Sequence, residues 1–291
     1  MIELRNGAST LRLLPELGAA VASWTRDGID ILHPVSDPKL AAQHEVPVGA
    51  YPLLPFSNRI GHGRFEFGGE HYQLAENFGG EPHTIHGNGW MREWTIAEQR
   101  EGLATLTLDH VGPAQQWPFH YAAAITYAIE DHRLLVAMRY RNTDARAQPV
   151  GLGFHPFFPR DADVELGFSA AGVWKAGADA LPETLLAVEG DWRFDPIRPV
   201  ADADLDNCFT GWGHEAELRW PSRGHGLRIA GSQPFGHLVV FTPPGRGYLA
   251  VEPASNMTDA INRMQIPDNG LVVLEPGGTL EASVTLELLS L

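Results

Sequence analysis

The stretch Ala104-Thr105-Leu106-Thr107-Leu108 alternates apolar and hydroxyl-bearing side chains with a period of two. This is the pattern of a β-strand that buries one of its faces. Residues 123–129 and 134–141 alternate in part in the same way, and the spacing of the three segments predicts a meander of antiparallel strands. Helical spacing is weak, and only residues 37–44 and 182–188 are expected to form a turn or two of helix. The sequence therefore predicts an all-β protein with antiparallel sheets packed face to face.

Glycine and proline support this interpretation, because 31 glycines and 22 prolines are spread along the 291 residues and leave little room for long helices. Gly68-Gly69 separates two short strand-like segments and predicts a hairpin. Residues 271–274 and 282–288 flank Pro276-Gly277-Gly278, which again predicts strand, turn and strand in a hairpin. Since no stretch has the composition of a flexible linker, we expect one domain over residues 1–291.

The overall charge and the single cysteine limit the classes of function. A formal net charge of -15 disfavours nucleic acids and anionic membrane surfaces, which need a cationic footprint, and mildly disfavours highly phosphorylated substrates. Cys208, without a second cysteine, excludes an internal disulfide framework and indicates a reducing compartment. The first residues carry no signal-peptide pattern, and no apolar run approaches eighteen residues. We expect a soluble cytoplasmic protein with no nucleic-acid or membrane partner.

Two segments carry candidates for proton transfer. His155 lies in Gly151-Leu152-Gly153-Phe154-His155-Pro156-Phe157-Phe158, where glycines and a proline constrain the backbone and aromatic neighbours shield the ring from water. Taken alone, it is either a catalytic histidine or a structural one that donates to a backbone carbonyl. Glu252 ends an apolar strand just before Pro253. It is either a partly desolvated general base or a solvated strand-end carboxylate.

Other polar residues could bind a ligand or serve the structure. His83 and His86 are three residues apart, which would suit two metal ligands on a helix, but the surrounding glycines make a helix improbable here. On a strand the two side chains would face opposite sides, so a metal site is not expected. His86 precedes Gly87, which leaves space for a ligand beside the ring. Arg59, next to Asn58, offers fixed donors for sugar hydroxyls or carboxylates, or ties a loop. Asp206 either binds hydroxyls or caps a turn.

Together, five blocks of this sequence resemble the aldose 1-epimerase, or galactose mutarotase, family. The blocks are Asn58-Arg59-Ile60, His86-Gly87, His155-Pro156-Phe157-Phe158, Leu205-Asp206-Asn207-Cys208-Phe209, and Val251-Glu252-Pro253 with Asp259-Ala260-Ile261-Asn262. They occur in the order and at the approximate separation typical of the family, and residues 274–277 match as well. The resemblance spans most of the chain, from about residue 50 to residue 262.

This resemblance implies a β-supersandwich and a cofactor-free, metal-free interconversion of the α and β anomers of a free aldose such as galactose or glucose. Glu252 matches the family's catalytic base, which takes the proton from the C1 hydroxyl. His155 matches the acid that protonates the ring oxygen, and His86 matches a second histidine of the active site. An acid and a base with pKa values on either side of neutrality suit this reaction.

The resemblance also implies a small-molecule sugar as the partner. Arg59 and Asp206 match groups that bind sugar hydroxyls, and Asn58 is expected to support Arg59. A monomer or a homodimer is expected. Two alternatives remain: a hexose-6-phosphate mutarotase of the same fold, for which no dense basic cluster is visible, and a non-catalytic carbohydrate-binding β-sandwich.

Overall fold

Two antiparallel sheets dominate the computed structural model, which describes residues 1–35, 47–200 and 202–291. In order across the first sheet lie β1 (Ile2–Asn6), β2 (Ser9–Leu14), β3 (Ala20–Arg26), β5 (Ala50–Leu53), β15 (Gly153–Pro159), β24 (Tyr248–Ala254), β23 (His237–Phe241), β20 (Asp206–Thr210), β17 (Gly172–Ala176) and β18 (Pro182–Leu186). A short strand, β4 (Ile29–Asp30), pairs with β3 beside this path.

The second sheet contains the predicted meander. Its order is β10 (Thr95–Arg100), β11 (Leu103–His110), β12 (Tyr121–Glu130), β13 (Arg133–Asn142), β26 (Thr279–Ser290), β22 (His225–Gly231), β21 (Glu215–Trp220), β16 (Glu165–Phe168) and β19 (Arg198–Pro199). The first four strands follow one another in sequence and in space, which confirms the meander. Along β12, buried and half-buried side chains alternate strictly, as a strand covered on one face requires.

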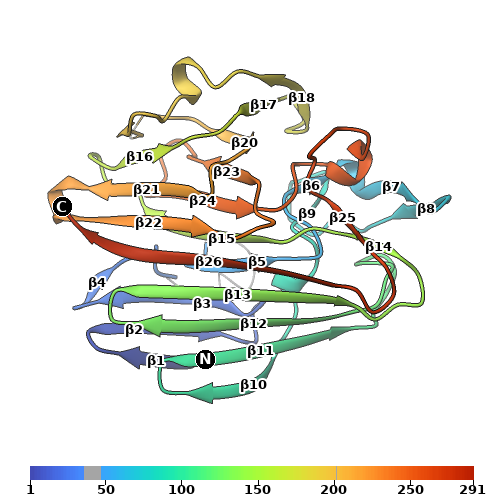
Figure 1. Ribbon diagram of the computed structural model, residues 1–291, viewed down its shortest axis with the longest axis horizontal. Coiled ribbons are helices and arrows are strands. Elements are labelled where there is room, and N and C mark those ends of the chain that lie inside the picture. Colours follow the sequence, from blue (N-terminus) through green and yellow to red (C-terminus); the bar gives the residue numbers. More distant parts are fainter. Residues whose placement is uncertain (36–46, 201) are drawn as a thin grey trace.

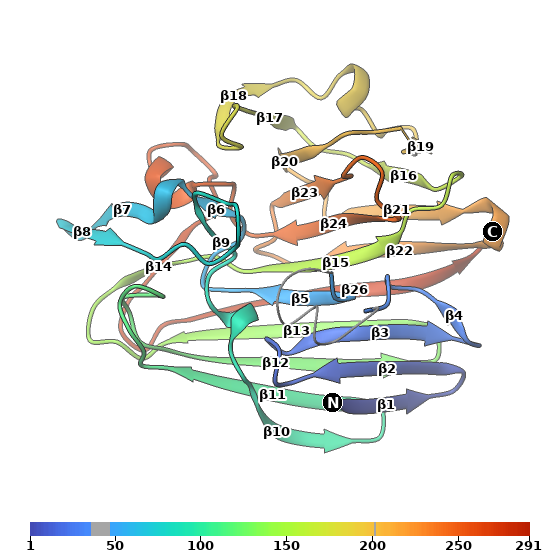
Figure 2. The same cartoon turned by 180° about the vertical axis from the view of Figure 1, so that it is seen from behind.

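The core lies between the two sheets, and its main cluster takes apolar side chains from both. Figures 1 and 2 show the sheets overlying one another with their strands roughly aligned, which is the packing of a β-sandwich. The prediction of an all-β supersandwich is therefore confirmed. No helix in the described ranges is long and apolar enough to cross a membrane.

Short elements gather at one end of the sandwich, on the right in Figure 1. They are the strand pairs β6 (Arg59–Ile60) with β9 (Thr84–Ile85), β7 (Arg64–Phe67) with β8 (Glu70–Gln73), and β14 (Gln148–Val150) with β25 (Val272–Leu274). The 3-10 turns are η1 (Gly61–Gly63), η2 (Gly89–Met91), η3 (Gly190–Trp192), η4 (Pro221–Arg223) and η5 (Ala260–Arg263). The β7–β8 pair confirms the hairpin predicted at Gly68-Gly69.

Two local predictions need correction. Residues 182–186 form β18 rather than a helical turn, because pairing with β17 satisfies their backbone hydrogen-bonding groups. This pairing outweighs their weak local preference for a helical turn. The strands around Pro276-Gly277-Gly278 exist but do not pair with each other: β25 pairs with β14, and β26 lies between β13 and β22. The turn instead docks on Asn142, whose backbone exchanges hydrogen bonds with residues 277 and 278. The helical turn expected at residues 37–44 lies outside the described ranges.

The central strands β15 and β24 are buried on both faces. Phe154 and Phe158 of β15 belong to the main core, so the intervening His155 and Phe157 project from the opposite, outer face of the sheet. On this outer face the sheet is covered locally by chain segments from the end where β6 and β9 lie. The pleat of the strands thus separates residues that build the core from residues that are free to build a site.

Candidate active site

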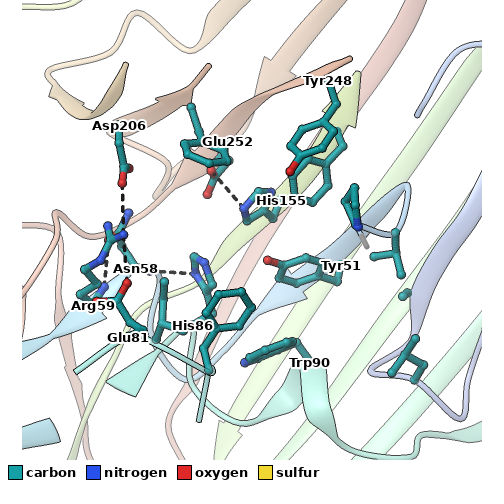
Figure 3. A pocket seen from close by; sticks show the side chains of 18 residues that line it. Tyr51, Asn58, Arg59, Glu81, His86, Trp90, His155, Asp206, Tyr248 and Glu252 are labelled. Atoms are coloured by element: carbon teal, nitrogen blue, oxygen red, sulfur yellow. Dashed lines mark hydrogen bonds and ion pairs between the residues drawn. The ribbon is translucent and has the colours of Figure 1, made fainter. Parts of the chain in front are cut away.

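A cavity of about 250 Å³ lies on the outer face of the first sheet. Side chains of β15, β20 and β24 form its floor, and residues of β5, β6 and the segment 78–90 form its walls. Figure 3 shows that the six side chains singled out from the sequence all line this cavity: Asn58, Arg59, His86, His155, Asp206 and Glu252. Segments far apart in the sequence therefore meet at one small cavity.

Glu252 and His155 face each other across neighbouring strands. Residues 153 and 157 of β15 pair with residues 254 and 250 of β24, so the two side chains fall midway between these pairs. Glu252 Oε1 lies 3.2 Å from His155 Nε2 (Figure 3). Both residues are buried, with 2% and 5% of their surface exposed. Glu252 Oε2 and His155 Nδ1 are buried and have no hydrogen-bond partner in the described parts of the chain.

Burial shifts the pKa values of this pair in opposite directions. Desolvation raises the pKa of Glu252 well above its ordinary value, and the nearby Asp206 adds to this effect. Desolvation lowers the pKa of His155 to about 3. The carboxylate is thereby made a stronger base and the imidazolium a stronger acid.

Arg59 lies at the wall of the cavity between two carboxylates. Its Nη2 atom is 3.1 Å from Asp206 Oδ2 and 3.3 Å from Glu81 Oε2, and its Nη1 donates to Asn58 Oδ1 over 3.3 Å. Burial alone would lower the pKa of Arg59, but the charges of Asp206 and Glu81 raise it above the ordinary value. The guanidinium is therefore a fixed cation, and the expectation that Asn58 contacts Arg59 agrees with the geometry.

His86 is held in one tautomer by the backbone. Its Nδ1 accepts a hydrogen bond from the N–H of Asn58 over 3.1 Å, so the proton of the neutral ring lies on Nε2. Burial, together with the charges of His155 and Arg59, lowers its pKa well below the ordinary value. Both His86 and Asn58 have positive φ, at 61° and 62°. The neighbouring Gly87 is required by packing, since a Cβ atom there would lie 2.1 Å from the carbonyl oxygen of Leu54.

The segment that follows β24 is hydrogen-bonded to the backbone on both sides of Arg59. The side chain of Asn256 accepts from the N–H of Ser57 and donates to its carbonyl, both over 3.1 Å. The N–H of Asp259 donates to the carbonyl of Arg59 over 2.8 Å, and its carboxylate accepts from the N–H of Gly61 over 3.0 Å. The segment that leaves the strand of Glu252 therefore also fixes the loop that carries Arg59.

His83 has a structural position outside the cavity. Its Nδ1 accepts from the N–H of His62 over 2.9 Å, which leaves Nε2 to donate to the carbonyl of Asp179 over 2.7 Å. Both ring nitrogens are thus occupied by backbone groups, whereas His86 points into the cavity. In residues 1–35, 47–200 and 202–291, no group of three or more His, Cys, Asp or Glu side chains is placed to hold a metal ion.

Comparison with known proteins gives the family. Residues 1–287 match the family model described as aldose 1-epimerase. The chain belongs to the aldose 1-epimerase family. The uncharacterized protein YphB of Escherichia coli K12 is 25% identical to this chain over 280 residues, which cover 93% of each of the two chains. Mouse galactose mutarotase is 27% identical over 258 residues, which cover 76% of this chain and 73% of the mouse protein.

Solved structures agree with the aldose 1-epimerase fold. A galactose mutarotase-like protein from Clostridium acetobutylicum superposes with a TM-score of 0.91 at 18% identity, covering 99% of this chain and 95% of the other. At this level of identity the likeness concerns the fold. The resemblance stated from five sequence blocks is therefore confirmed for the family and for the supersandwich.

The lining residues that were not singled out from the sequence include Tyr51, Glu81, Trp90 and Tyr248. Tyr248 lies four residues before Glu252 on the same strand, so a period of two could have placed it on the same face. Tyr51 pairs with His155 across β5 and β15, with 4.8 Å between ring centroids, and stacks on Trp90 at 5.6 Å. Strand order and loop packing create these contacts, which a local pattern does not encode.

Proposed function

We propose that this protein interconverts the α and β anomers of an unphosphorylated aldose such as galactose or glucose by acid–base catalysis. The proposal rests mainly on the buried contact between Glu252 and His155, a carboxyl and an imidazole group that face each other in a sugar-sized cavity. Membership of the aldose 1-epimerase family supports the same reaction class. A module that only binds sugar would not need this pair.

In the proposed reaction, Glu252 takes the proton from the C1 hydroxyl while His155 delivers a proton to the ring oxygen. The C1–O5 bond breaks, and an open-chain aldehyde forms. After rotation about C1–C2, the hydroxyl at C5 attacks the other face of the aldehyde. His155 takes back its proton from this oxygen, and Glu252 returns one to the C1 oxygen, so the pair ends with the proton count with which it began.

The remaining polar residues are proposed to position the sugar. Arg59 and Asp206 present a donor and an acceptor at the cavity wall, which suits the hydroxyl groups of a pyranose. His86, neutral with its proton on Nε2, offers a further donor to oxygen near C1 or the ring. Tyr51 and Trp90 add aromatic faces against which the C–H groups of a sugar can pack.

Polarimetry tests the proposal directly. Freshly dissolved α-galactose and α-glucose are each followed with and without the protein, and the drift of optical rotation toward equilibrium is expected to be faster with it. Glucose 6-phosphate in the same assay separates the sugar-phosphate alternative. If several free aldoses bind without any acceleration, the protein is a carbohydrate-binding module and the proposal is wrong.

A further inference from the structure

Two carboxylates contact Arg59, and this distinguishes it from an arginine that binds an anionic ligand. Asp206 and Glu81 both contact Nη2 of the guanidinium, at 3.1 Å and 3.3 Å. Arg59 has only 13% of its side chain exposed, and Glu81 has only 17%. An arginine that recognises a phosphate or a sugar carboxylate offers its paired donors to the ligand. Here one of the terminal nitrogens is already bound to two protein carboxylates.

The charged side chains that line the cavity also argue against an anionic ligand at Arg59. Among the described residues of its lining, Arg59 is the one Lys or Arg side chain, and it faces the two negative charges of Glu81 and Asp206. An anionic sugar placed against Arg59 would therefore also stand beside two carboxylates in a partly desolvated space, where like-charge contacts are unfavourable.

Glu81 approaches Arg59 from a turn beside the cavity. The turn at residues 78–81 is closed by a hydrogen bond from the Glu81 N–H to the carbonyl of Phe78, over 3.1 Å. The second carboxylate oxygen, Oε1, lies 3.9 Å from Nε2 of the buried His83. The side chain thus reaches from a turn at the rim to the guanidinium, as Figure 3 shows.

We propose that Glu81 is a specificity-determining residue: together with Asp206 it outweighs the charge of Arg59, and so restricts the cavity to uncharged and cationic aldoses. This inference rests on the proposed function for its substrate class. It goes further by assigning to one residue the exclusion of sugar acids and sugar phosphates. An amino sugar, by contrast, places its ammonium group in a site with an excess of negative charge.

The test compares ligands that differ in charge, using the whole protein and its Glu81→Gln variant. Galactose, galacturonate, glucose 6-phosphate and galactosamine, each brought to anomeric equilibrium beforehand, are titrated as competitors of α-glucose mutarotation and, independently, by calorimetric binding. The glutamine keeps an acceptor for Arg59 but loses the charge. We expect the wild-type protein to prefer galactose to galacturonate by about tenfold or more, and Glu81→Gln to reduce that preference by about tenfold.

Glu76→Gln is the matched control. Glu76 lies five residues earlier on the same loop, is exposed and does not line the cavity, yet its substitution changes the net charge equally. An unchanged preference in this variant, with a changed one in Glu81→Gln, supports the local role. If Glu81→Gln changes the affinity for neutral and anionic ligands equally, Glu81 has only a structural role and the proposal is overturned.

The two proposals fail separately. If the wild-type protein accelerates no mutarotation, the proposed function is wrong, but calorimetric titration still measures the charge preference. If it accelerates mutarotation of neutral aldoses but binds galacturonate as tightly as galactose, the specificity inference is wrong while the proposed function stands. A protein that binds none of the four sugars overturns both.

Discussion

The carboxylate of Glu252 and the imidazole of His155 face each other on adjacent strands, with 3.2 Å between Oε1 and Nε2. Antiparallel register places them opposite one another, and the pleat turns both away from the core. Burial then makes one a stronger base and the other a stronger acid. The first prediction concerns this pair.

Glu252→Gln or His155→Gln is expected to lower the enzymatic mutarotation rate by roughly 10²–10⁴-fold, the usual effect of removing a general acid or base. Because the two groups act as a unit, the double variant should lose little more than either single variant. Polarimetry of fresh α-galactose measures the rates. His132→Gln, at an exposed histidine, serves as a control and should keep full activity. Additive losses would contradict the proposal that the two groups act together.

The pH dependence of the rate should reflect the opposed pKa shifts. Burial lowers the pKa of His155 to about 3, so this ring does not titrate near pH 6.5, where an ordinary histidine does. After subtraction of the uncatalysed rate, we therefore expect no inflection of the rate near pH 6.5. An exposed histidine acid would instead give a decline near pH 6.5, and that result would count against the burial argument.

Asp259 is expected to position Arg59. Asp259→Ala removes the acceptor of the Gly61 N–H and places alanine at φ 57°, so the fold should lose about 1–3 kcal/mol and KM should rise more than kcat falls. Asp259→Asn keeps an acceptor and tolerates this conformation, so it should restore most of the affinity. Steady-state kinetics and thermal unfolding measure both effects. If the asparagine variant is as impaired as the alanine variant, the hydrogen bond is not what matters.

Metal removal should leave the rate unchanged. The proposed proton exchange needs no Lewis acid, and both ring nitrogens of His83 are engaged by backbone groups. We therefore expect mutarotation before and after exhaustive chelation to agree, with metal analysis of the same samples as the control. Loss of activity on chelation that is restored by one metal ion would contradict the mechanism.

His237 should make the protein sensitive to acid. Its Nδ1 lies 3.0 Å from the carbonyl of Ser255, and burial lowers its pKa to about 4. The unfolded chain takes up the proton near pH 6.5, so the stability that the neutral ring contributes is complete above that pH. It is lost as the pH falls toward the folded pKa, by up to roughly 3 kcal/mol.

Denaturant unfolding at several pH values measures this contribution. His237→Gln is expected to flatten the decrease in unfolding free energy between about pH 6.5 and about pH 4. His71→Gln, at a histidine with 85% of its side chain exposed, should leave the slope as in the wild-type protein. A slope that is identical in all three proteins would contradict the linkage.

Much of the fold was predictable because its signals are local. The alternation in residues 104–108 and 123–129 reports which face of a strand is buried, and the turn at Gly68-Gly69 reports a hairpin. The errors have a common cause. Residues 182–186 became a strand because β17 lies beside them, and the turn at 276–278 joins strands whose partners come from elsewhere. Long-range pairing decided both.

By itself, the sequence determined the strands, the candidate residues of the site and their chemical types, because side-chain chemistry and the period of two are properties of neighbouring residues. Tertiary structure alone decided that Glu252 lies against His155, that Tyr51 stacks on Trp90, and that Glu81 reaches Arg59. These contacts depend on strand order, on register and on the exclusion of water. Such properties arise only when distant segments pack together, and they give the site its pKa values and its charge.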